Sequence, residues 1–197
     1  MRYSAGIMSY SFWYLETRTT AKYMVKGLSK SEISNLAIKD NIYQVGSERR
    51  AKELLNVTYR RLKDFHIELL EYFLNSNSDM GKIFVLISVL KTDRLFFEFM
   101  HEVFREHILI GNHLILNTEF DSFFINKAYQ SELIENWKDT TIMKLKAVYK
   151  NFLSEAGLLK KVDEGFEIIT PILDVELKSL LEKDNHQPFI NVITGEN

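Results

Sequence analysis

The side chains best suited to chemistry in this sequence are cations spaced along one side of a helix. They are the cations Arg49, Lys52, Arg60 and Lys63, with the neutral Asn56 among them, and the spacings from 49 to 63 are 3, 4, 4 and 3 residues. At about 100° per residue this spacing places all five on one face, with no Asp or Glu among them. Such a row suits contacts with the phosphates of a nucleic acid, and a solvated helix face is the alternative interpretation.

A second polar group belongs to a helix expected from Thr140, as its N-cap, to Ala156. The apolar side of this helix carries Ile142, Leu145, Val148, Tyr149, Phe152 and Leu153, and its outer side carries no acid. Gly157 follows, and then a β-hairpin with two lysines in its first strand. The residues expected to contact DNA in this region are Thr140, Thr141, Lys144, Lys150, Asn151, Lys160 and Lys161.

The order of these elements is that of a winged helix-turn-helix, in which the third helix enters the major groove and the hairpin lies against the backbone. An ordinary amphipathic helix followed by a hairpin is the alternative. No side chains are arranged for obvious base reading, so phosphate contacts would position the protein.

Catalytic and metal-binding patterns are not recognised. The sequence has no glycine-rich phosphate loop, no GxSxG and no HExxH, and its 0 Cys exclude disulfides and cysteine zinc sites. Glu98 and His101 have the Glu-x-x-His spacing of a di-iron helix, but no second such pair exists. The sequence therefore predicts a protein that is not an enzyme, with no metal and no cofactor.

The composition predicts a mainly α protein. Of 197 residues 46% are hydrophobic and 26% charged, and only 2 Pro and 8 Gly are present, too few for many short strands. We expect a helical bundle-like fold with helix-turn-helix or winged-helix-like subdomains and a small hairpin wing. An N-terminal helical DNA-binding-like subdomain would span 1–76, and a C-terminal subdomain would span 77–197, with the winged helix at about 118–171.

The net charge is -2, but it is unevenly distributed. Residues 1–75 and 138–161 each carry +4, whereas 76–137 carry -4 and 162–197 carry -6. A local basic patch can steer polyanions even when the whole chain is nearly neutral. No secretory signal is recognised at the start, and the longest apolar run, Ile83–Leu90, is far shorter than the roughly 20 residues that span a bilayer. A cytoplasmic protein is expected.

Hydrophobic periodicity predicts further elements. One helix should run from Ser9 to Met24 or Val25, a short one should end near Lys39, and one long helix should run from Ser47 through Phe73. The tail Phe189–Thr194 could be a strand or disordered.

Short motifs along most of the chain resemble one known family. They include Tyr3-Ser4-Ala5-Gly6, Glu16-Thr17-Arg18, Asn41-Ile42-Tyr43-Gln44, Glu98-Phe99-Met100, Trp137-Lys138-Asp139-Thr140-Thr141 and Leu153-Ser154-Glu155-Ala156-Gly157. In this order and spacing the chain resembles BrxA, the small helical component of BREX bacteriophage-exclusion systems. The resemblance implies a non-enzymatic helical protein that binds double-stranded DNA and works beside the BREX methyltransferase and other defence components.

Two other functions stay open. The first is a protein-interaction adaptor that docks other subunits through the Phe-rich middle and the acidic C-terminal block. The second is an RNA-binding module, which the resemblance implies because the family's fold is also similar to that of the antitermination factor NusB.

Overall fold

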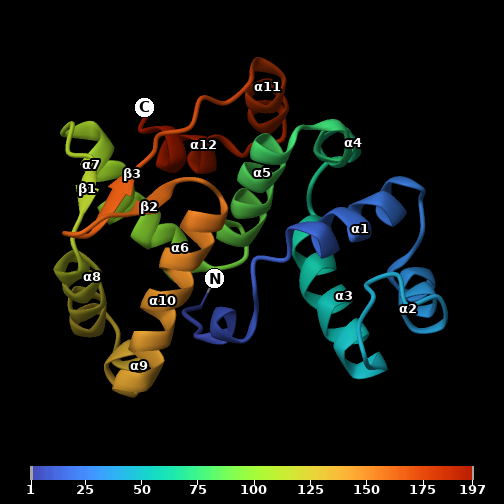
Figure 1. The fold of residues 1–197 in the computed structure, drawn as a ribbon, viewed down its shortest axis with the longest axis horizontal. Helices are drawn as coiled ribbons and strands as arrows, with labels where there is room; N and C mark the ends of the chain where they lie inside the picture. The colour runs from blue at the N-terminus through green and yellow to red at the C-terminus, as the bar shows by residue number, and fades with distance from the viewer. Residues whose placement is uncertain (1, 197) are drawn as a thin grey trace. The chain divides into compact units, whose positions relative to one another are not determined.

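The computed structural model describes residues 2–196, and most of them are helical, so the prediction of a mainly α protein is confirmed (Figure 1). They form two compact units, each assembled from separate parts of the chain. The N-terminal unit contains 13–92 and 174–185. The C-terminal unit contains 2–12, 93–173 and 186–196. No helix among the described residues is long and apolar enough to span a membrane.

Helices alone make up the described part of the N-terminal unit. They are α1 (Tyr14–Val25), α2 (Lys30–Lys39), α3 (Glu48–Leu62), α4 (Ile67–Asn75), α5 (Ser78–Leu90) and α11 (Val175–Lys183). Side chains at their first turns explain where several begin: Ser29 and Glu32 form a capping box at α2, and Asn77 accepts from the Met80 N–H at α5. The residues of α5 from 83 to 90 are all buried, which makes this helix the centre of the unit.

The prediction of a single long helix from Ser47 to Phe73 is wrong, because this segment forms two helices, α3 and α4, with a break between them. At the break the His66 N–H donates to the Asp184 carboxylate, 3.0 Å away and 118 residues later in the sequence. The Phe65 ring is buried and packs against Phe84, with ring centroids 4.9 Å apart. Tertiary contacts therefore end a helix that local periodicity would continue.

Helices also dominate the C-terminal unit, around a small sheet. Its helices are the 3₁₀ helix η1 (Gly6–Ser9), α6 (Arg94–Phe99), the π-helical η2 (Met100–Phe104), α7 (Arg105–Leu109), α8 (Asn117–Gln130), α9 (Glu132–Glu135), α10 (Asp139–Glu155) and α12 (Gln187–Thr194). Its strands are β1 (Leu114–Ile115), between α7 and α8, and β2 (Leu159–Lys161) and β3 (Phe166–Ile168), after α10. The strands pair antiparallel in the order β1-β3-β2, so the predicted hairpin is present and β1 joins its far edge. Gly165 lies in the hairpin turn, where an added Cβ would lie 2.5 Å from the Ile115 carbonyl oxygen.

Aromatic rings fill the core of the C-terminal unit. Phe96 stacks on Tyr149 at 4.3 Å between centroids, and Phe99 stacks on Phe120 at 4.8 Å. These four rings are fully buried, as is Phe104. Phe96, Phe99 and Phe104 of the Phe-rich middle are therefore core residues.

Three local predictions are wrong. The first α-helix begins at Tyr14 rather than Ser9, because η1 and an extended segment precede it. The N-cap of α10 is Lys138, and Thr140 is already the second helical residue. The tail expected to be a strand or disordered is α12, which has Pro188 in its first turn and ends at Gly195 in the left-handed conformation.

Candidate nucleic-acid interface

The basic face of α3 (Arg49, Lys52, Asn56, Arg60 and Lys63) is fully displayed. Ser47 caps the helix by accepting from the Arg50 N–H, and the opposite face buries Ala51, Leu54, Leu55, Thr58 and Leu62. All five residues of the basic face are exposed, including Lys63, which is the C-cap of the helix. From Arg49 to Lys63 the row is about 21 Å long at 1.5 Å per residue. It is therefore an exposed basic ridge, here called the α3 ridge.

Lys52 of the α3 ridge has an acidic neighbour on the same helix. The Lys52 ammonium lies 3.8 Å from the Glu48 carboxylate, and both side chains are well exposed, so this pair contributes at most about 1 kcal/mol. Arg50, outside the ridge, pairs with Glu53 at 2.8 Å. Arg61, next to Arg60 in the sequence, is buried, with its guanidinium 5.8 Å from the Trp13 ring centroid. Arg61 therefore belongs to the packed interior of the N-terminal unit.

The residues of α10 that were expected to contact DNA differ in their exposure to solvent. Thr140, Lys144 and Asn151 are exposed, and Thr141 is half-buried. Asn151 donates to the Glu155 carboxylate of the next turn at 2.7 Å. A ligand that approaches Asn151 therefore also meets an acid.

Lys150 lies on the side of α10 that packs against α8. Its ammonium donates to Asn117 Oδ1 at 2.6 Å and lies 4.6 Å from the Phe120 ring centroid and 5.1 Å from that of Phe166. Burial lowers the pKa of Lys150, against a smaller opposite effect of Asp121. Lys150 is thus held over the core, unlike the freely displayed Lys144.

The lysines of the hairpin are exposed on β2. Lys160 lies opposite Glu167 of β3, and Lys161 lies opposite Phe166. Lys160 therefore has a carboxylate as cross-strand neighbour, whereas Lys161 has an aromatic one. The hairpin turn itself carries Asp163 and Glu164, so the only positive charges on the hairpin are those of the two β2 lysines.

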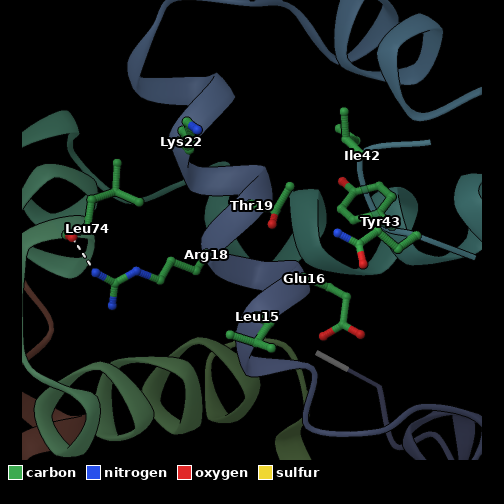
Figure 2. Close-up of a pocket in the computed structure, with 9 residues that line it drawn as sticks. Leu15, Glu16, Arg18, Thr19, Lys22, Ile42, Tyr43 and Leu74 are labelled. Atoms are coloured by element: carbon green, nitrogen blue, oxygen red, sulfur yellow. Dashed lines mark hydrogen bonds between the residues drawn. The ribbon is translucent and has the colours of Figure 1, made fainter. Parts of the chain in front are cut away.

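A cavity of about 590 Å³ lies beside α1 in the N-terminal unit (Figure 2). Two of the motifs noted above, one at Glu16–Arg18 and one ending at Gln44, both contribute to its lining. Figure 2 shows Arg18 pointing to Leu74, whose carbonyl accepts from its guanidinium. Arg18 also donates to the Tyr14 hydroxyl at 2.9 Å. Because Leu74 lies in the last turn of α4, the bond to its carbonyl stabilises the C-terminal end of that helix.

The side chains of Glu98 and His101 have separate neighbours. Glu98 accepts hydrogen bonds from the Tyr3 hydroxyl at 2.8 Å and the Arg94 guanidinium at 2.7 Å, and its carboxylate lies 2.7 Å from the Lys127 ammonium. His101 is exposed and lies beside the Phe97 ring. Residues 2–196 contain no group of three potential His, Cys, Asp or Glu metal ligands.

Sequence reasoning missed the apolar side chains that surround the start of α10. Ile125, Met143 and neighbouring residues line an open groove between α8, α9 and α10. The sequence does place Met143 on the outer side of α10, and an apolar residue there is the signal that could have indicated this groove.

These observations define a class of protein: a mainly α-helical chain with a small three-stranded sheet, an exposed basic helix face and no metal-ligand group among the described residues. The chain belongs to the BrxA family, whose model matches residues 1–185. This confirms the resemblance seen in the sequence motifs.

Two relatives match over nearly their full length. The chain is 36% identical to the BREX protein BrxA of Bacillus cereus (strain H3081.97), over 98% of this chain and 97% of that protein. It is 21% identical to the BREX protein BrxA of Paramagnetospirillum magneticum (strain ATCC 700264 / AMB-1), over 98% and 96%. The fold is similar to the crystal structure of an uncharacterized protein from Magnetospirillum magneticum, with a TM-score of 0.83, 20% identity and 100% of both chains covered.

Proposed function

We propose that this BrxA-family protein is a non-enzymatic accessory factor of a BREX phage-defence system that binds double-stranded DNA mainly through phosphate contacts. The α3 ridge is the observation that carries this proposal, since its four cations and Asn56 are all exposed on one face of the helix. At about 21 Å the ridge is long enough to follow a phosphate backbone over several nucleotides.

The topology of the C-terminal unit gives separate support. Helices α6, η2 and α7, strand β1, helices α8, α9 and α10, and strands β2 and β3 follow one another, with the sheet order β1-β3-β2. This succession is typical of winged-helix proteins, in which the third helix reads the major groove. In such an arrangement Thr140, Lys144 and Asn151 of α10 would approach DNA, with Lys160 and Lys161 on the hairpin.

The salt dependence of DNA binding tests the ridge, because it counts neutralised phosphates. Log K falls with log salt by about 0.9 per phosphate contact on duplex DNA. Replacing Arg49, Lys52, Arg60 and Lys63 together by Ala should therefore flatten the slope by up to about 3.6 units. Fluorescence anisotropy with a labelled 30-base-pair duplex, titrated at several salt concentrations, measures this slope.

A charge-matched control separates the ridge from a general charge effect. Lys22, Lys26, Lys30 and Lys39 are exposed cations of the same unit that lie outside the ridge. Their replacement by Ala changes the net charge equally and should leave the slope nearly intact. Equal slope losses in both variants, or no loss in the ridge variant, would contradict the proposal.

The nucleic acid and its sequence are tested in the same assay. Three unrelated duplexes should bind with similar affinity, because phosphate contacts carry no base information. A loss confined to one duplex would indicate base readout. Competition by duplex RNA that exceeds competition by duplex DNA would favour the RNA-binding alternative.

A further inference from the structure

An open apolar groove lies between α8, α9 and α10 of the C-terminal unit. It has a volume of about 490 Å³, and its lining includes Ile125, Ile134, Trp137, Ile142 and Met143. Figure 1 shows α9 between the ends of α8 and α10, so the groove is bounded by three consecutive helices.

Several large apolar side chains here remain in contact with water. Met143 is 67% exposed and Ile125 is 54% exposed, and both line the groove. Tyr129 and Leu133, next in sequence to the lining residues Ala128 and Ile134, are 87% and 52% exposed. A gathering of exposed apolar residues marks a binding surface more often than isolated ones do.

The charged residues of the groove have a net negative charge. Asp121 forms an ion pair with Lys146, the only cation of the lining. Glu135 and Asp139 also line it, and neither forms an ion pair within the part of the chain that the structure describes. Two carboxylates are therefore left to attract positive charge, which disfavours phosphates and favours Lys or Arg side chains.

We propose that this groove binds an amphipathic helix of a partner protein, with apolar side chains in the groove and Lys or Arg residues beside Glu135 and Asp139. Apolar anchors at i, i+3, i+4 and i+7 of one helix fit a groove bounded by helices. At about 100° per residue, Lys144 and Asn151 lie about 80–140° around α10 from the groove residues Asp139 and Met143. The inference does not depend on DNA binding.

A library of displayed helical peptides tests the inference even though the partner is unidentified. The library contains 14-residue helices with fixed apolar anchors and randomised flanking positions, and it is selected on the full chain. A second bait carries Ile125→Lys and Met143→Lys, which place charge in the groove at two exposed positions. A control bait carries Ile110→Lys and Ile169→Lys, at exposed apolar residues elsewhere in the unit.

The wild-type and control baits should enrich the same peptides, with Lys or Arg at the flanking positions, and the groove variant should lose them at least tenfold. The enriched peptides should shift the indole N–H resonance of Trp137, which lines the groove, and leave that of Trp13 unchanged. Replacing both carboxylates, as Glu135→Gln and Asp139→Asn, should remove the preference for basic flanks. Indistinguishable pools from the wild-type and groove-variant baits, or enrichment of acidic flanks, would overturn the inference. A shift of the Trp137 resonance by duplex DNA but by no peptide would do the same.

Discussion

Replacement of Lys127 by Met should strongly destabilise the protein, because this lysine neutralises two carboxylates while almost completely buried. Its side chain is 3% exposed, and its ammonium pairs with both Glu98 and Glu102. Removal of one partner from a buried pair costs about 3–5 kcal/mol. Glu98 keeps its hydrogen bonds from Tyr3 and Arg94, so we expect the lower end, about 3 kcal/mol.

Lys146→Met is the matched control. Lys146 of α10 pairs with Asp121, which lies on α8 as Lys127 does. The side chains of Lys146 and Asp121 are 20% and 52% exposed, and a pair of this kind contributes about 0.2–1 kcal/mol. Urea unfolding followed by tryptophan emission measures both variants. Equal losses of unfolding free energy in the two variants would refute the argument from burial.

The pH dependence gives an independent check on the same cluster. Burial alone would raise the pKa of Glu98, but hydrogen bonds from Lys127, Arg94 and Tyr3 outweigh burial and hold this pKa below its usual value. The pKa of Lys127 is raised, since its bonds to Glu102 and Glu98 outweigh the effect of burial. The stabilisation from Glu98 is therefore present above about pH 4.3 and is lost as pH falls through the lower, folded-state pKa. The difference between wild type and Lys127→Met should shrink in that acidic range.

Three further outcomes are expected. Lys144→Glu should weaken DNA binding and change the free energy of unfolding by less than about 0.5 kcal/mol. Lys150→Glu should weaken DNA binding and also cost about 1–3 kcal/mol of unfolding free energy, because it places a carboxylate against core rings. Fluorescence anisotropy and urea unfolding measure both variants. Burial lowers the pKa of Lys91, whose ammonium has no hydrogen-bond partner among the described residues, so Lys91→Met should gain about 0.5–1 kcal/mol at pH 7, a gain that shrinks as pH rises toward about 10.4. Gly165→Ala should cost about 1–3 kcal/mol in urea unfolding, because its Cβ would collide with the Ile115 carbonyl oxygen, and an unchanged midpoint would contradict this.

Features that depend on local periodicity could be predicted from the sequence. The exposed face of α3 follows from 100° per residue alone, and the hairpin after Gly157 follows from turn residues between apolar runs. The helix break before His66 could not be predicted, because the side chain that accepts its N–H belongs to Asp184, 118 residues away.

Long-range packing also explains the remaining errors. Lys150 has the same helical signal as Lys144, and only the positions of Asn117 and Phe120 separate an inward from an outward lysine. In α12 the β-branched residues Ile190, Val192 and Ile193 favour a strand locally, yet all three are buried in a helix that starts near a proline and ends at a glycine. Burial outweighed propensity there.

The division of the chain into two interleaved units bears on its synthesis. The N-terminal unit needs residues 174–185, and its helix α4 is bound by α11 through the Lys183–Glu68 ion pair at 2.6 Å. The C-terminal unit in turn uses residues 2–12 and 186–196. During translation neither unit is complete until residues 174–196 have left the ribosome, so α1 to α5 are synthesised long before α11 can pack against α4. Any protein that captures the nascent chain would meet α4 with its α11-binding face still uncovered.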